Sequence, residues 1–218
     1  MSDALARTTA RPAGPRPRLR AVALLAPAGW LAAMAAVFGL ADAGGFTGHM
    51  AIHLLNITLV APLAALATRG HRPAWLPAPV VAAFIELLAV WAWHAPSAHA
   101  FARASIGGFL LEQASFVAGA WLLWATVIDA ALQRDRSAMA QSVLALLLTS
   151  MHMTLLGGVL ALAGRDPYGA GLCGSATTGL DAMADLQLGG VLMLGVAATV
   201  YLIAALRLAS MLLERHRA

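Results

Sequence analysis

The sequence has no lysine and one cysteine, so all fourteen of its basic residues are arginine. The single cysteine, Cys173, has no partner for a disulfide within the chain, and zinc or redox motifs built on cysteine pairs are excluded. Phosphate-binding loops and dinucleotide fingerprints are also missing from the sequence. These absences argue against ATP-driven pumping by this chain alone.

Charged residues are scarce as well. Asp, Glu, Lys and Arg make up 11% of the 218 residues, and hydrophobic residues make up 61%. A soluble domain carries about 25% charged residues, so this composition indicates a membrane protein. The net charge of +4 does not indicate a nucleic-acid partner, because the arginines flank apolar segments that would sit in lipid.

Six apolar segments have roughly the length of about 20 residues that a helix needs to span a bilayer. They cover residues 21–41, 49–68, 77–94, 107–131, 139–163 and 185–209. The sequence therefore predicts an all-α polytopic membrane protein with a bundle of about six transmembrane helices. Glycine pairs within these segments allow close helix contacts in lipid, within one chain or in a homodimer.

The bundle is predicted to form one domain over residues 21–210. Residues 1–20 are rich in proline and arginine and are predicted to be a disordered tail, and residues 211–218 form a second tail. The apolar segment 21–41 is about twice as long as the core of a signal peptide, which favours a retained helix. The sequence around Ala41 leaves cleavage of this segment open.

The arginines are distributed unevenly between the two sides of the predicted bundle. Twelve fall on one side, whereas only Arg103 and Arg165 fall on the other. Because cytoplasmic segments carry the excess of basic residues, both termini are predicted to be cytoplasmic. The loops 42–48, 95–106 and 164–184 then face the exoplasmic side. This topology is that of a multi-pass protein of the bacterial plasma (inner) membrane, with these loops in the periplasm of a Gram-negative host.

Two histidines, His49 and His53, lie four residues apart at the start of the second apolar segment. Positions i and i+4 share one face of a helix, so both imidazoles are predicted to point the same way. Imidazole is a ligand for copper, zinc and haem iron, and the thioether of the intervening Met50 favours Cu(I). The pair is therefore predicted to belong to a metal site.

Further polar residues fall inside or at the ends of the predicted helices. Those near the exoplasmic ends are His94, Glu112, Gln113, Asp185 and Gln187, while His152 and Glu86 lie deeper. Ionisable residues in spans are costly and commonly mark function. Each also has a structural alternative, such as packing or, for Asp185, capping its own helix. His99 falls in the predicted loop 95–106 and is a weak candidate.

Five segments together resemble one known family, the CtaG-type cytochrome c oxidase assembly factors. The resemblance covers residues 46–210 and rests on the segments HMAIHLL with the following LVAP, WAWHAP, LLEQASFVAGAWLLWATV, LLGGVLALAGRDPYGAG and ADLQLGGVLM, in the family's order. His49, His53, His94, Asp185 and Gln187 match polar positions of the family. Gln113 stands where a histidine is common, Leu186 replaces the first residue of a doubled glutamine, and His152 is an addition.

The resemblance implies an integral membrane protein that helps to mature cytochrome c oxidase through copper delivery. We therefore expect a copper chaperone, and not an enzyme, that holds Cu(I) near the exoplasmic face. The expected ligands are His49 and His53, joined by His94, Met50 or His152. The expected supporting residues, which orient the imidazoles or complete the polar set, are Glu112, Asp185, Gln187 and Glu86. The expected partner is an oxidase subunit or a periplasmic copper carrier, within membrane lipid and without nucleic acid.

Two other functions remain open from the sequence. A copper transporter would use Glu86 and His152 as stations along a path through the membrane. A b-type cytochrome would hold haem between histidines on facing helices, for example His53 and His152.

Overall fold

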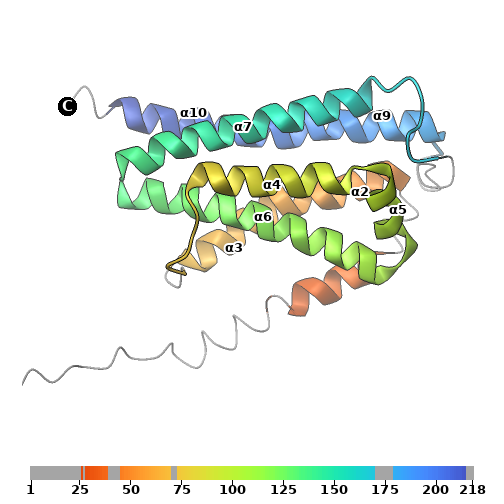
Figure 1. Cartoon of the computed structure of the whole chain (residues 1–218), viewed down its shortest axis with the longest axis horizontal. Helices are drawn as coiled ribbons and strands as arrows, with labels where there is room; N and C mark the ends of the chain where they lie inside the picture. The colour runs from red at the N-terminus through yellow and green to blue at the C-terminus, as the bar shows by residue number, and fades with distance from the viewer. Residues whose placement is uncertain (1–25, 27, 39–44, 70–72, 170–178, 215–218) are drawn as a thin grey trace, which may run out of the picture.

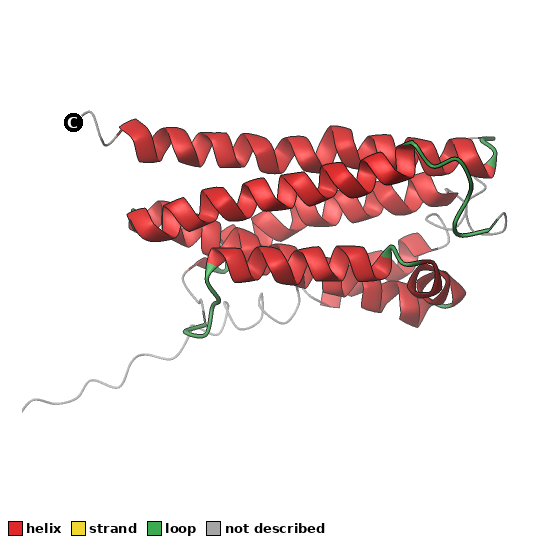
Figure 2. Ribbon diagram, turned by 45° about the horizontal axis from the view of Figure 1, so that its top comes forward, coloured by secondary structure: helices red, strands yellow, loops and turns green. Residues whose placement is uncertain are grey.

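A computed structural model describes residues 26, 28–38, 45–69, 73–169 and 179–214, and these residues fold into a bundle of helices without a strand (Figures 1 and 2). The helices of the first half are α2 (Gly45–Leu55), η1 (Asn56–Val60), α3 (Ala61–Ala67), α4 (Pro79–Trp93) and α5 (Pro96–Ala104). Those of the second half are α6 (Ile106–Gln133), α7 (Arg136–Ala161), α9 (Ala182–Leu192), η3 (Met193–Ala198) and α10 (Thr199–Glu214). The all-helical fold class is confirmed.

Four helical stretches are long and apolar enough to cross a membrane. They are Gly45–Ala67, Ile106–Gln133, Arg136–Ala161 and Ala182–Glu214. A fifth span is possible if α4 and α5, which meet at an angle of 77°, are counted together. The described residues thus provide four or five spans rather than the expected six. Of the first predicted segment, Ala28–Phe38 forms a short apolar helix, and the tails 1–20 and 215–218 lie outside the described residues.

Helix boundaries follow from capping residues in the sequence. Ser105, Asp135 and Asp181 each precede a helix, and each side chain accepts a hydrogen bond from a backbone N–H of its first turn. Such acceptors satisfy N–H groups that have no partner inside the helix. At the start of α4 and of α5, Pro79 and Pro96 occupy the first helical position, where their missing N–H costs nothing.

The predicted loop 95–106 is wrong, because most of it is the helix α5. Pro96 starts a new helix after the turn at His94 and Ala95, and α5 then runs across the end of the bundle, where Figure 2 shows it nearly end-on. This helix buries His99 and Arg103 at its inner side. The change matters because it moves His99 from a loop to the interior.

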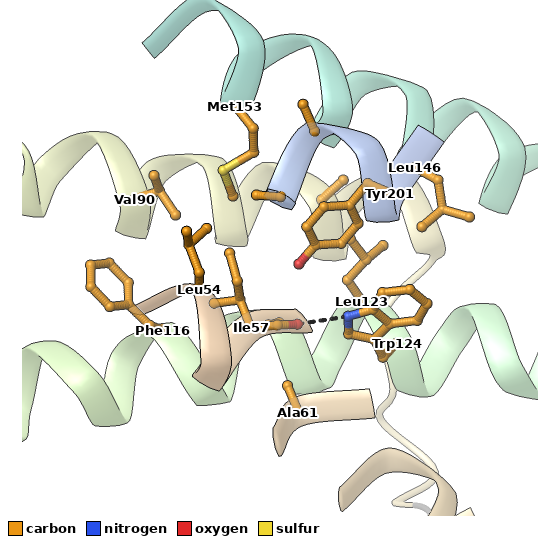
Figure 3. Packing of buried hydrophobic residues seen from close by; sticks show 14 of the residues in the cluster. Leu54, Ile57, Ala61, Val90, Phe116, Leu123, Trp124, Leu146, Met153 and Tyr201 are labelled. Atoms are coloured by element: carbon orange, nitrogen blue, oxygen red, sulfur yellow. Dashed lines mark hydrogen bonds between the residues drawn. The ribbon is translucent and has the colours of Figure 1, made fainter. Parts of the chain in front are cut away.

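Two π-helical turns interrupt the long spans, η1 after α2 and η3 after α9. A π-helical turn breaks the regular hydrogen-bond ladder and leaves carbonyl groups that need other donors. The Trp124 indole N–H donates to the carbonyl of Ile57 at 3.0 Å (Figure 3), and the Ser150 hydroxyl donates to that of Ala198 at 2.8 Å. Side chains of α6 and α7 thus satisfy the irregular backbone within the bundle.

Helices α7 and α9 meet backbone to backbone at two glycines. A Cβ atom placed on Gly190 would lie 2.5 Å from the backbone nitrogen of Ala161, and one on Gly157 would lie 2.9 Å from the carbonyl oxygen of Gly190. Small residues allow such close approach between membrane helices. This contact fixes α9, and with it Asp185, relative to the rest of the bundle.

Candidate metal centre

The residues His49, His99 and Glu112 come together at one end of the bundle, from α2, α5 and α6. Each offers one ligand atom, and these atoms all lie within 4.8 Å of one another. Within the described ranges, this is the one set of three or more His, Cys, Asp or Glu residues with that spacing. We call these three residues the outer set.

The three side chains are almost completely inaccessible to solvent. The rings of His49 and His99 lie edge to face with centroids 5.0 Å apart, and His49 Nδ1 lies 3.6 Å from Glu112 Oε2. The guanidinium group of Arg103, also buried, interacts electrostatically with His49 and with Glu112. Arg103 therefore brings a basic side chain beside the imidazoles and the Glu112 carboxyl group.

All side-chain polar atoms of the outer set except Glu112 Oε2 lack a hydrogen-bond partner among the described residues. In the described part of the chain, neither ring nitrogen of His49 or of His99 has a hydrogen bond, nor does Glu112 Oε1. A buried polar atom without a partner costs free energy, and nearly all such atoms in proteins are paired. A metal ion would bind one atom of each of the three residues, because imidazole nitrogen and carboxylate oxygen are both metal ligands. The donor set therefore fits a transition-metal ion.

A chain of amide hydrogen bonds positions the Glu112 carboxylate. The side-chain amide of Gln113 donates to Glu112 Oε2 at 3.1 Å and accepts from Asn56 Nδ2 at 2.8 Å. Asn56 in turn accepts from the indole N–H of Trp30 at 3.1 Å. Gln113, which stands where a histidine is common in the family it resembles, therefore holds a carboxyl group in place and connects it to the short helix Ala28–Phe38.

Phe46 lies between the histidines and the last long span. Its ring contacts those of His49, His99 and Tyr168, with centroids 5.9, 5.5 and 5.3 Å away. On its other side the ring fills the space above Gly189, where an added Cβ would lie 2.5 Å from Phe46 Cδ1. The ring therefore covers the outer set with apolar surface.

Asp185 fixes the start of α2. Its carboxylate accepts hydrogen bonds from the backbone N–H of Phe46 at 2.6 Å and of Thr47 at 3.2 Å, and its carbonyl accepts from the Thr47 hydroxyl. A carboxylate at a helix N-terminus is favourable because it satisfies free N–H groups and complements the helix dipole. Asp185 thus orients His49 through the backbone of α2, whereas Asp181 caps Asp185's own helix.

His94, at the end of α4, lies beside the outer set. Its ring centroid is 6.3 Å from that of His49 and 5.8 Å from that of His53. His94 Nδ1 lies 2.7 Å from the carbonyl oxygen of Val90, and the Tyr168 hydroxyl donates to the His94 carbonyl at 2.9 Å. The ring and the backbone of His94 are both fixed by hydrogen bonds.

The other predicted ligands are not part of the outer set. His53 is fully buried and packs on the ring of Phe116 at 4.0 Å, and His152 is buried on α7. Met50 packs against Gly189 in the apolar core. His53 therefore lies outside the outer set, although it shares a helix with His49.

Two predicted supporting residues make other contacts. The Glu86 carboxylate accepts from the Tyr201 hydroxyl and, at 3.5 Å, from the Thr149 hydroxyl, in the middle of the bundle. The Gln187 amide donates to the Ala163 carbonyl at 3.3 Å. Neither hydrogen bond involves an imidazole.

In the sequence, His99 is only a weak candidate for the site, and Phe46 and Tyr168 are not candidates. A signal for His99 was present, because the segment PSAHAFARA, which begins with Pro96 at a first helical position, predicts a short helix in place of a loop. The contacts of Phe46 and Tyr168 depend on helices that are far apart in the sequence, and periodicity carries no information about them.

The sequence model of a family described as the cytochrome c oxidase caa3 assembly factors (Caa3_CtaG) matches residues 4–215. The match covers nearly the whole chain. The chain belongs to this family. Comparisons with curated proteins and with solved structures each return no match.

The structure explains why this assembly factor carries the segments by which it resembles the CtaG-type proteins. In ADLQLGG, Asp185 caps α2, Gly189 makes room for Phe46 and Gly190 allows the contact with α7. In GRDPYG, Tyr168 holds the backbone of His94. These segments therefore assemble one end of the bundle around the outer set.

Proposed function

We propose that this oxidase assembly factor binds copper, as Cu(I), at the outer set of His49, His99 and Glu112 and passes it to an oxidase subunit or a periplasmic copper carrier. The single observation that carries the proposal is the buried, unpartnered state of the outer set's ring nitrogens within the described structure. The family match supports a role in oxidase assembly. Copper as the cargo is what the resemblance of the sequence segments to CtaG-type factors implies. The role is that of a carrier, so no bond of a substrate is broken.

The distribution of arginine supports an outward-facing site. Among the described residues, Arg103 and Arg165 lie at the end that holds the outer set. The opposite end holds Arg69, Arg134, Arg136 and Arg207. By the positive-inside rule, this distribution favours an outer set near the exoplasmic face of the bacterial plasma membrane. A partner outside the cytoplasm would then approach the end of the bundle that holds the copper.

The test is copper content. The full chain is purified in detergent after anaerobic loading with Cu(I), and copper per chain is measured by mass spectrometry. His49→Ala combined with His99→Ala is expected to bind one copper ion fewer than the parent. Glu86→Gln is the matched control, because it alters a buried carboxylate whose hydrogen bonds lie outside the outer set. Unchanged copper content in the double histidine variant would overturn the proposal.

Cellular measurements separate the carrier from the two alternatives. For a carrier, the double histidine variant should lose oxidase activity while total cell copper stays constant. A fall in copper uptake would instead favour the transporter. An optical spectrum of the purified protein tests the cytochrome, because a Soret band would indicate haem.

A further inference from the structure

The short helix Ala28–Phe38 contributes no residue to the outer set, yet it packs against the helices that carry His49 and Glu112. Its contacts are with α2 and α6, where the Phe38 ring lies 5.2 Å, centroid to centroid, from that of Phe109 (Figure 1). The residues on this side of the short helix are Trp30, Met34, Val37 and Phe38. Their spacing of four, three and one residues is that of one helix face, so the sequence itself specifies the contact.

A hydrogen bond lies within this apolar contact. The indole N–H of Trp30 donates to Asn56 Oδ1 at 3.1 Å, and Asn56 is fully buried at the start of η1. Asn56 Nδ2 donates to Gln113 Oε1 at 2.8 Å and lies 3.5 Å from Met34 Sδ. Burying an amide costs free energy that its hydrogen bonds must offset, and an apolar side chain would avoid this cost. Asn56 therefore does more than fill space between the helices.

The hydrogen bonds that begin at Trp30 all run in one direction. An indole N–H only donates, so it fixes the oxygen of the Asn56 amide toward Trp30 and the nitrogen toward Gln113. Gln113 then presents its oxygen to Asn56 and its nitrogen to Glu112, where Nε2 donates to Oε2 at 3.1 Å. We call Trp30, Asn56 and Gln113 the amide chain. It starts at a donor on the short helix and ends at a proposed copper ligand.

The end of the amide chain determines how the Glu112 side chain is held. Oε2 accepts from Gln113, whereas Oε1 is buried and has no hydrogen-bond partner within the described ranges. A hydrogen bond to one oxygen restricts rotation of the carboxyl group, and so fixes where the other oxygen points. Groups that hydrogen-bond to metal ligands orient them and change metal affinity in this way. Without Asn56 the Gln113 amide could rotate, and Glu112 would lose this restraint.

We propose that Trp30 is a positioning residue of the copper site, and that the docked helix Ala28–Phe38 raises the copper affinity of the outer set through the amide chain. This inference rests on the proposed function, because it requires Glu112 to be a copper ligand. Apolar contacts are sufficient to attach an apolar helix to the bundle, whereas the amide chain connects that helix to a ligand. The segment 21–41, whose cleavage the sequence leaves open, is then part of the working site and stays attached.

Copper affinity tests the role of Trp30. The full chain in detergent is titrated anaerobically with Cu(I) against a chromophoric chelator. Trp30→Phe keeps an aromatic ring but removes the N–H, and it should raise the Kd about tenfold. Trp121→Phe is the matched control, because the indole N–H of Trp121 also donates at 3.1 Å, from α6 to the Thr68 hydroxyl. Its Kd should equal that of the parent.

Coordination at the copper ion separates positioning from a loss of stability. X-ray absorption should count three light-atom neighbours in the parent and in Trp121→Phe, one from each residue of the outer set. Trp30→Phe should have two, because Glu112 is no longer held against the ion. A purely structural role of Trp30 would lower the unfolding temperature and leave the number of neighbours unchanged.

A double-mutant cycle tests whether the amide chain acts as a unit. Asn56→Leu replaces the amide by an apolar side chain of similar size and should raise the Kd about 10- to 100-fold. In that background Trp30→Phe should have no further effect on the Kd, because the connection to Gln113 is already broken. Trp121→Phe should remain without effect in both backgrounds.

The outcomes distinguish this inference from the proposed function. Trp30→Phe with the parent's Kd and three neighbours overturns the positioning role and leaves the outer site standing. Equal losses in Trp30→Phe and Trp121→Phe overturn it as well, as does a copper-loaded chain from its native membrane that begins after Ala41 by mass spectrometry. A parent that binds no copper overturns the proposed function and with it the role of Trp30. If Asn56→Leu does not unfold cooperatively, Asn56→Ala replaces it, and Trp30→Phe decides in either case.

Discussion

Two groups of buried polar side chains lie in the same bundle and differ in how their hydrogen bonds are satisfied. In the middle, both oxygens of the Glu86 carboxylate accept from hydroxyl groups, those of Tyr201 and Thr149. At the histidine end, the ring nitrogens of the outer set have no partner within the described structure. A satisfied buried network rigidifies a core, whereas an unsatisfied one is the expected signature of a site that waits for a ligand.

The largest expected effect comes from loading the histidine end with metal. A ligand at a thousandfold excess over its Kd stabilises a protein by about 4 kcal/mol. Thermal unfolding in detergent should show a gain of this order for the parent with Cu(I). The gain should shrink in His49→Ala plus His99→Ala and persist in Glu86→Gln. An equal gain in all three proteins would contradict the distinction between the two groups.

The second effect should appear at Glu86. Glu86→Ala leaves the buried hydroxyls of Tyr201 and Thr149 without their acceptor, and we expect a loss of about 2–4 kcal/mol of unfolding free energy. Glu86→Gln should lose less, because an amide oxygen still accepts from Tyr201. Copper content should not change in either variant. A folded Glu86→Ala protein with less copper would instead favour the transporter.

A smaller loss of stability is expected at the glycine contact between α7 and α9, the helix that contains Asp185. Gly190→Ala would force α9 away from α7, at a cost of about 1–3 kcal/mol, and should weaken copper binding by loosening α2. Gly158→Ala is the matched control, because an added Cβ there meets nothing within 4 Å. Alanine has the higher helix propensity, so this variant should raise the unfolding free energy by up to about 1 kcal/mol. Thermal unfolding and chelator competition measure both quantities. Equal behaviour of the two variants would show that the contact does not support the site.

The smallest expected effect is a gain in the stability of the protein without metal, at His152. His152→Leu replaces an unpartnered buried imidazole by an apolar side chain of similar size, and unloaded protein should gain about 1 kcal/mol of stability. Thermal unfolding without metal measures the gain. Destabilisation of the unloaded protein would show that the ring contributes to packing or hydrogen bonding.

A sequence predicts those features of a fold that depend on contacts between residues close together in the chain. Five of the six predicted segments coincide with candidate spans of the structure, if α4 and α5 count as one span, because span length and apolar composition are properties of a continuous stretch. The position of Glu112 near His49 was also accessible, because depth along each helix could be counted. The inward position of His99 was not, since it depends on the 77° turn between α4 and α5.

The roles of Asp185 and Gln113 were equally inaccessible. Each depends on a partner from another helix, Phe46 for Asp185 and Asn56 for Gln113. A residue type and its depth predict that such a side chain is polar and buried. They do not predict which backbone or side chain it will bind.

The hydrogen bonds between Asp185 and the start of α2 have a consequence for biosynthesis. Phe46 and Asp185 are 139 residues apart, so the first ligand helix receives its N-terminal cap only after the start of the span Ala182–Glu214 has been made. A growing chain folds from its N-terminus as it emerges. His49 therefore acquires its final orientation only after the earlier helices of the bundle have been made. The order of the helices along the chain delays the assembly of the metal centre until the bundle that surrounds it is complete.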